Sequence, residues 1–186
     1  IKEVSFGNDG NISRDKLEDC INSDLANNFG NLCQRVTAFA AKNCNSSIPK
    51  EINFEKNDLK ILNKYKDNLN TIRSKIDSQN INFYIDYIIN SLFEANKYFN
   101  DEEPWNKKND IIRLNTIIYT TLEIVRKISF LLYPIIPESS LKALAIFNLK
   151  ENDIIFSSIG ENEFLTKGEK INKIDILFKK KKKKND

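Results

Sequence analysis

Apolar residues recur three and four positions apart through most of the chain, which is the spacing of an amphipathic helix. The first predicted helix, from Ser13 to about residue 42, has one apolar stripe formed by Leu25, Phe29, Leu32, Val36 and Phe39. The same repeat covers residues 59–76, 81–99 and about 107–133, and a short fifth helix is expected at residues 137–149. The pattern therefore predicts an all-α fold, an antiparallel bundle of about five helices.

Glycine and proline mark where this pattern is interrupted. No glycine occurs between residues 31 and 159, and the four prolines fall between the predicted helices or at their starts. After Leu149 the helical repeat gives way to short apolar clusters separated by Gly160 and Gly168. These clusters predict a bundle over residues 13–150, followed by an extended tail over residues 151–186 that needs another surface to cover it.

The formal net charge of +3 is misleading, because the run Lys179–Lys184 contributes six of the positive charges. Without that run, the chain has 23 basic and 26 acidic residues. A body of that charge cannot bind nucleic acid through a broad basic face, which normally supplies most of the affinity that is independent of sequence. RNA binding would then depend on a few placed side chains, with a modest non-specific contribution from the lysine run.

The composition also excludes several kinds of chemistry. The chain has no histidine, and its three cysteines (Cys20, Cys33 and Cys44) form no CxxC pair, which fits a reducing compartment. No glycine-rich phosphate loop is present, and no serine or cysteine has a base partner. We therefore expect neither a catalytic residue nor a metal site. The chain also lacks methionine and starts at Ile1, so we expect a segment of a longer protein.

Two features are candidates for ligand binding. Asn27, Asn31 and Arg35 are four residues apart and form a polar row that faces away from the apolar stripe of the first helix. Amide and guanidinium groups can read the edge of an unpaired base and hold a phosphate, although such a row can also be an ordinary solvated face. Trp105 lies at a corner between helices, where its ring either offers a base a stacking platform or plugs the end of the core.

Phrases along nearly the whole chain resemble signature segments of the methionyl-tRNA synthetase family, in that family's order. They are Phe6–Ser13, Asn22–Asn27, Gly30–Arg35, Ala95–Tyr98 followed by Glu103–Trp105, Leu131–Pro137 and Leu177–Lys179. The resemblance implies the anticodon-binding helical bundle of a class I aminoacyl-tRNA synthetase. Residues 1–12 would then end the junction after the catalytic core, and residues 151–186 would pack back on a catalytic domain that is absent from this sequence.

The resemblance also joins the two candidate features into one site. Asn31 and Arg35 match the family's residues that contact the first base of the anticodon CAU, and Trp105 matches the residue that stacks on that base. Pro104 matches the proline that shapes the corner, and the residue matched by Asn27 borders the same site.

The ATP-binding signatures, the zinc-binding insertion and the appended tRNA-binding barrel of the family are absent. The resemblance therefore implies the recognition part of a cytoplasmic, monomeric ligase that charges tRNA(Met) with methionine. The full-length enzyme would use ATP and Mg²⁺, whereas this segment would bind no cofactor. Its partners would be the anticodon loop and the catalytic domain in cis. No membrane or DNA partner is expected. Two alternatives stay open: the helical domain of another class I synthetase, and a non-catalytic scaffold that binds a protein through the apolar tail.

Overall fold

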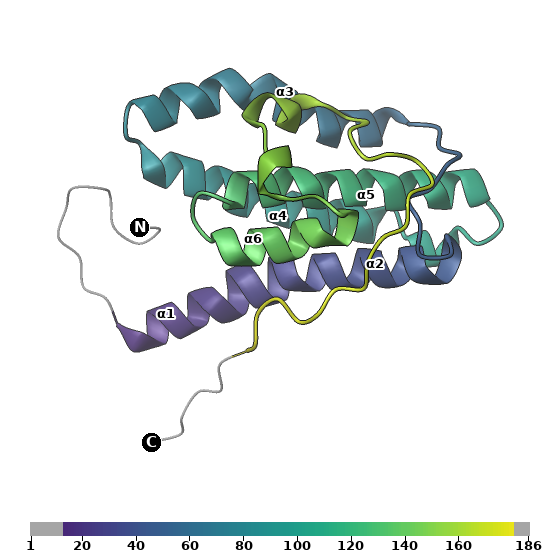
Figure 1. Cartoon of the computed structure of the whole chain (residues 1–186), viewed down its shortest axis with the longest axis horizontal. Helices are drawn as coiled ribbons and strands as arrows, with labels where there is room; N and C mark the ends of the chain where they lie inside the picture. The colour runs from purple at the N-terminus through teal and green to yellow at the C-terminus, as the bar shows by residue number, and fades with distance from the viewer. Residues whose placement is uncertain (1–12, 181–186) are drawn as a thin grey trace.

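The computed structural model describes residues 13–180, which form a bundle of long helices with a tail wrapped across it (Figure 1). The first helical rod comprises α1 (Arg14–Cys20), η1 (Ile21–Gly30) and α2 (Asn31–Asn43). It is followed by α3 (Lys56–Asp77), α4 (Ile81–Asp101), the 3₁₀ turn η2 (Pro104–Asn106), α5 (Ile111–Leu132), α6 (Pro137–Leu144), and the 3₁₀ turns η3 (Ala145–Phe147), η4 (Glu151–Asp153) and η5 (Phe156–Gly160). Among the described residues the only β pairing is one isolated bridge, between Ser47 and Lys170, so the all-α prediction is confirmed.

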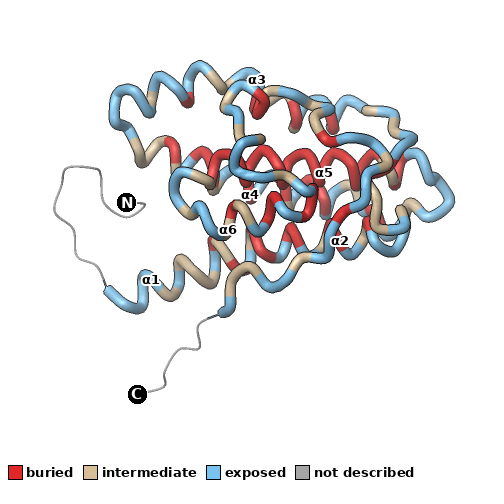
Figure 2. Tube along the Cα trace, in the orientation of Figure 1, coloured by how far each residue is buried: buried red, intermediate tan, exposed pale blue. Residues whose placement is uncertain are grey.

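Helix α5 is the centre of the bundle. From Arg113 to Leu132 every residue except Asn115 is buried, and Figure 2 shows this continuous buried segment between the other helices. Helices α2, α3, α4 and α6 all pack against it. The helix begins four residues later than the expected position 107, because the Asp110 side chain accepts a hydrogen bond from the Arg113 amide (3.0 Å) and caps it there.

The first rod departs from the regular helix that its apolar stripe predicts. Its start agrees with the prediction, since the Ser13 hydroxyl accepts a hydrogen bond from the Lys16 amide (3.2 Å). Its middle, η1, is a π-helix, in which the amide of Asn31 bonds to the carbonyl of Ala26, five residues back. This wider turn shifts the face that points inward, so that Ala26 is buried and Leu25 only half-buried.

Part of the apolar tail packs on the bundle itself. Ile159, Leu165 and Ile171 are buried within the described residues, and Phe164 packs edge-on against Phe130 of α5 with ring centroids 6.0 Å apart. The bundle thus covers part of the tail, and Figure 1 shows the tail running from α3 across α5 to α2. Ile155 and Ile176 remain exposed. Packing of the tail against a catalytic domain stays a prediction.

A buried group of charged side chains on α5 fixes the start of the tail. Arg126 donates hydrogen bonds to the carbonyls of Ser158 (3.1 Å) and Glu161 (2.9 Å), and its Nε pairs with Glu123 (2.8 Å). The other carboxylate oxygen of Glu123 accepts a hydrogen bond from the Leu165 amide (2.7 Å). The tail has no strand partner for its backbone over this stretch, so these side chains satisfy the polar groups that its burial would otherwise leave unpaired.

Lys127 completes this group and gives the fold a pH dependence. Its ammonium donates to the carbonyls of Ile159 (2.6 Å) and Glu161 and lies 3.4 Å from the Asn162 side-chain oxygen. Burial, together with the nearby charge of Arg126, lowers the pKa of Lys127 from 10.5 to about 7. Between these two values the unfolded chain binds more protons than the folded one, so the free energy of unfolding rises as the pH increases.

We therefore expect Lys127→Met to remove a pH-dependent component of stability. The parent should gain stability relative to the variant as the pH rises from about 7 to about 9. Urea unfolding of both proteins across this range measures the difference, and the general loss caused by the substitution cancels from the slope. Parallel curves for the two proteins would contradict the assignment.

Candidate functional site

Arg35 and Trp105 come together around one aromatic ring. The guanidinium of Arg35 lies 4.9 Å from the centroid of the Phe99 ring, and the Trp105 indole packs edge-on against the same ring with centroids 6.5 Å apart. Arg35 also donates a hydrogen bond to the side-chain oxygen of Asn100 (2.7 Å). Residues from α2, the end of α4 and η2 thus form one polar and aromatic corner.

The local backbone explains why Trp105 remains accessible. Glu103 adopts a left-handed conformation with φ of 46°, which turns the chain sharply after α4. Pro104 follows at the first position of η2, where its fixed φ is suitable, and its ring is buried beneath the corner. Trp105 is left 39% exposed. Its ring therefore does not simply plug the core, and part of it is free to stack on a ligand.

An ion-pair network between α3, α4 and α5 stabilises this corner. Arg113 of α5 makes two hydrogen bonds to Asp58 of α3 (2.6 and 3.1 Å) and one to Glu102, the C-terminal cap of α4 (2.6 Å). The Tyr98 hydroxyl also donates to Asp58. Burial disfavours the charge of Arg113, but its bonds to Asp58 and Glu102 outweigh that cost and raise the pKa of the guanidinium. The network fixes Glu102 one residue before the turn that presents Trp105.

Asn27 and Asn31 lie further along the same rod. Both side chains are exposed, and both line a hollow of about 730 Å³ whose opposite wall is the last described part of the tail, including Phe178 and Lys179. Gly30 lies between them, and an added Cβ there would be 3.4 Å from the Phe178 ring. The structure therefore places Arg35 and Trp105 against the same ring, that of Phe99, while the two asparagines line the hollow beside the tail.

Sequence reasoning missed several residues that surround the corner. Lys42 and Lys108 line a hollow of about 230 Å³ beside Pro104 and Trp105. Both are exposed lysines in a lysine-rich chain, so their sequence positions carried no signal. Asn100 also went unrecognised, although it lies just before the Glu103–Trp105 turn and Arg35 bonds to it.

The described part of the chain contains no group of three or more His, Cys, Asp or Glu side chains that could hold a metal ion. Burial raises the pKa of the Cys33 thiol, so this cysteine is not a nucleophile at neutral pH. None of the helices in residues 13–180 is long and apolar enough to cross a membrane.

Comparison with known proteins identifies the family. The model of the anticodon-binding domain of methionyl tRNA ligase matches residues 48–186. The chain belongs to this family. Among curated relatives, the methionine–tRNA ligase of Rickettsia felis is 35% identical over 185 residues, or 96% of this chain and 36% of that protein. The ligase of Mycobacterium leprae is 35% identical over 164 residues, covering 86% of this chain and 30% of that protein.

Solved structures lead to the same family. The free form of Mycobacterium tuberculosis methionyl-tRNA synthetase superposes with a TM-score of 0.89 at 32% identity, covering 97% of this chain and 37% of that one. The complex of that enzyme with methionyl-adenylate gives a TM-score of 0.87 at 33% identity, covering 95% of this chain and 35% of that one. This anticodon-binding domain thus spans about a third of the length of the ligases that it matches.

The family match bears differently on the two halves of the corner. Pro104 and Trp105 lie inside residues 48–186, whereas Asn27, Asn31 and Arg35 precede that range. The Rickettsia felis ligase, by contrast, aligns over 96% of the chain. Membership of the family therefore identifies the fold of the chain. The role assigned to each site residue depends on the geometry described above.

Proposed function

We propose that this chain recognises the anticodon CAU of tRNA(Met) as part of a methionine–tRNA ligase. The observation that carries the proposal is that Arg35 and the partly exposed Trp105 both contact the Phe99 ring. A flat base can stack on the exposed part of the indole while the guanidinium, which stays charged at neutral pH, donates to a phosphate or a base edge. Asn31, one helical turn before Arg35, adds an amide on the same rod.

The proposed donor and acceptor groups suit cytosine. An unpaired cytosine presents an amino donor beside ring acceptors, which an asparagine amide and an arginine fork can complement. Uracil places a carbonyl where cytosine has its amino group, and an unsatisfied partner there costs about 1–3 kcal/mol. Asn27, which lines the hollow next to Asn31, would border this site, and Pro104 would hold the indole in place.

We further propose that the complete protein attaches methionine to tRNA(Met) using ATP and Mg²⁺ in the cytoplasm, as a monomer. A solved relative is bound to methionyl-adenylate, an intermediate that ATP and methionine would supply. Those groups would bind a catalytic domain in cis, and residues 151–186 would contact it. Nothing in residues 13–180 resembles a catalytic site, so the segment alone should be inactive.

The substitution Trp105→Ala tests the site directly. We expect it to weaken binding of a CAU anticodon stem-loop by about 1–3 kcal/mol, because stacking on the indole is lost. Phe93→Ala is a matched control, since Phe93 is an aromatic side chain that is 55% exposed on α4. Fluorescence anisotropy with the CAU stem-loop and one with uracil in place of cytosine measures both affinity and selectivity.

The same titrations separate the alternatives. A protein-binding scaffold would bind neither stem-loop, and the domain of a synthetase for another amino acid would not prefer CAU. Undiminished binding of CAU by Trp105→Ala would show that the indole does not stack on the base. Circular dichroism should show an intact fold for both variants, because neither side chain belongs to the buried core.

A further inference from the structure

Three hollows adjoin one another along α2. The 730 Å³ hollow beside Asn31 shares Gln34 with a second hollow of about 380 Å³, and that one shares Ala38 with the 230 Å³ hollow beside Trp105. From Asn31 to Lys42 the helix rises about 16 Å at 1.5 Å per residue. This row of hollows is therefore longer than a site for one base requires.

The charge along this row is of one sign. None of the described residues that line the three hollows is Asp or Glu, and five of them are lysines: Lys42, Lys108, Lys173, Lys179 and Lys180. Two hollows on the α3–α4 side have the opposite character. They are lined by five acidic residues and three lysines: Asp67, Asp86, Glu94, Asp101, Glu102, Lys60, Lys64 and Lys97.

Most of the lysines on the α3–α4 side are paired with a carboxylate among the described residues, and Lys60 is the exception among those three. On the α3–α4 side, Lys64 pairs with Glu94 (2.5 Å) and Lys97 with Asp101 (2.8 Å). Across residues 13–180 no ion pair joins any of the five lysines of the α2 row to a carboxylate. A phosphate chain would therefore meet five lysines along α2 with no acidic side chain among the described residues lining the same hollows, although the body of the protein carries a small negative charge.

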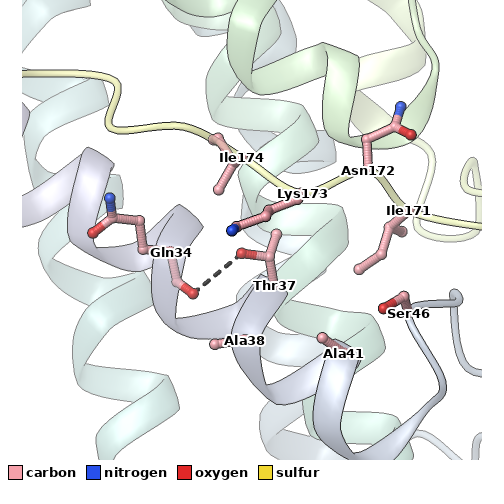
Figure 3. A pocket seen from close by; sticks show the side chains of 9 residues that line it. All are labelled: Gln34, Thr37, Ala38, Ala41, Ser46, Ile171, Asn172, Lys173 and Ile174. Atoms are coloured by element: carbon pink, nitrogen blue, oxygen red, sulfur yellow. Dashed lines mark hydrogen bonds between the residues drawn. The ribbon is translucent and has the colours of Figure 1, made fainter.

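The tail builds the outer wall of the middle hollow at a fixed position. Ile171 is buried. The side chain of Asn172 donates to the carbonyl of Ala145 (2.7 Å), and the backbone amide of Asn172 donates to the carbonyl of Ile146 (2.8 Å). Lys173 follows directly. Figure 3 shows its side chain extending from the tail toward α2, where Gln34 and Thr37 line the same hollow.

We propose that these hollows form one RNA-binding groove, in which the strand next to the recognised cytosine lies between α2 and the tail and Lys173 neutralises a phosphate. The proposal rests on the anticodon assignment and extends it, because it gives the tail a direct part in RNA binding. Lys173 positions the strand and does not read its sequence, since phosphates are the same at every nucleotide.

Salt dependence tests this assignment. The affinities of the parent chain, Lys173→Ala and Lys60→Ala are measured by fluorescence anisotropy over a series of salt concentrations, with the CAU stem-loop and its uracil counterpart. Lys60 is the matched control, because it is an exposed lysine on the acidic side with no ion pair among the described residues. Circular dichroism checks that all three proteins are folded.

We expect Lys173→Ala to weaken binding of both stem-loops by the same factor and to reduce the slope of log affinity against log salt by about 0.7–1. Lys60→Ala should leave the slope unchanged. Equal slopes for the parent and Lys173→Ala, or an equal reduction in both variants, would overturn the groove while a preference for CAU still stands. A parent chain that binds the two stem-loops equally would instead refute the anticodon assignment.

Discussion

Replacing Arg113 by leucine should destabilise the protein by about 3–5 kcal/mol, because it leaves the carboxylate of Asp58 buried without its cation. Asp58 is completely buried and receives two hydrogen bonds from Arg113. Its remaining partners are the hydroxyl of Tyr98 and the amide of Glu55. Urea unfolding, followed by circular dichroism, measures the loss.

A second substitution separates the cost of leaving the Asp58 charge unpaired from the cost of the lost packing of Arg113. Adding Asp58→Asn to Arg113→Leu removes the charge and keeps one oxygen that can accept from the Glu55 amide, while the new NH₂ group can donate to the Tyr98 hydroxyl. The double variant should therefore be more stable than Arg113→Leu alone. Arg14→Leu is the surface control. It removes an exposed pair with Glu18, and the unfolding midpoint should stay at the parental value. A double variant no more stable than the single one would show that packing, not charge, sets the cost.

The Arg113 variant also tests how the corner is positioned. Because Arg113 bonds to Glu102, its loss should loosen the turn that presents Trp105. The fluorescence of Trp105 reports this directly, since the chain has no other tryptophan. We expect a shift toward the emission of a more solvated indole under conditions in which the helices remain folded.

Replacing Glu123 by alanine should cost a similar amount, about 3–5 kcal/mol, and should release the tail first. Glu123 is fully buried, and its carboxylate joins the Arg126 side chain to the backbone amide of Leu165. Without it, the buried Arg126 guanidinium has lost its carboxylate partner, and the Leu165 amide has lost its acceptor. The contacts that hold residues 158–165 against α5 would weaken together.

Limited trypsin digestion combined with urea unfolding measures both parts of this effect. Cleavage after Lys167 or Lys173 should become faster in Glu123→Ala while the helical core resists. Glu123→Gln keeps one of the two acceptor oxygens and should lose less stability than Glu123→Ala. Glu163→Ala, which removes an exposed tail pair with Lys167, should change neither rate nor stability. Uniform cleavage throughout the bundle in Glu123→Ala would contradict a role confined to the tail.

Release of the tail would have a consequence for RNA binding. Lys173 lies only eight residues after Leu165 in the sequence, and the groove along α2 has the tail as its outer wall. The buried charges of α5 and the exposed lysines of the groove are therefore connected through one segment.

The sequence by itself determined the helices and most of their ends. The apolar repeats located α3, α4 and α5, Ser13 and Pro137 marked helix starts, and a family resemblance carried by short phrases singled out Arg35 and Trp105. The helices and their starts follow from local properties of the chain, namely the 3.6-residue period of apolar side chains and the capping of free amides. Such local signals are present in the chain before it folds.

Only the tertiary structure decided the remaining features. The three charged residues Glu123, Arg126 and Lys127 interrupt an apolar stretch, and nothing local indicates that they lie in the core as partners of tail carbonyls. The contact of Arg35 with Asn100 spans 65 positions, and the hollow that joins Gln34 to Lys173 spans even more. Such contacts depend on how whole elements pack, because no short-range period relates residues so far apart in the chain.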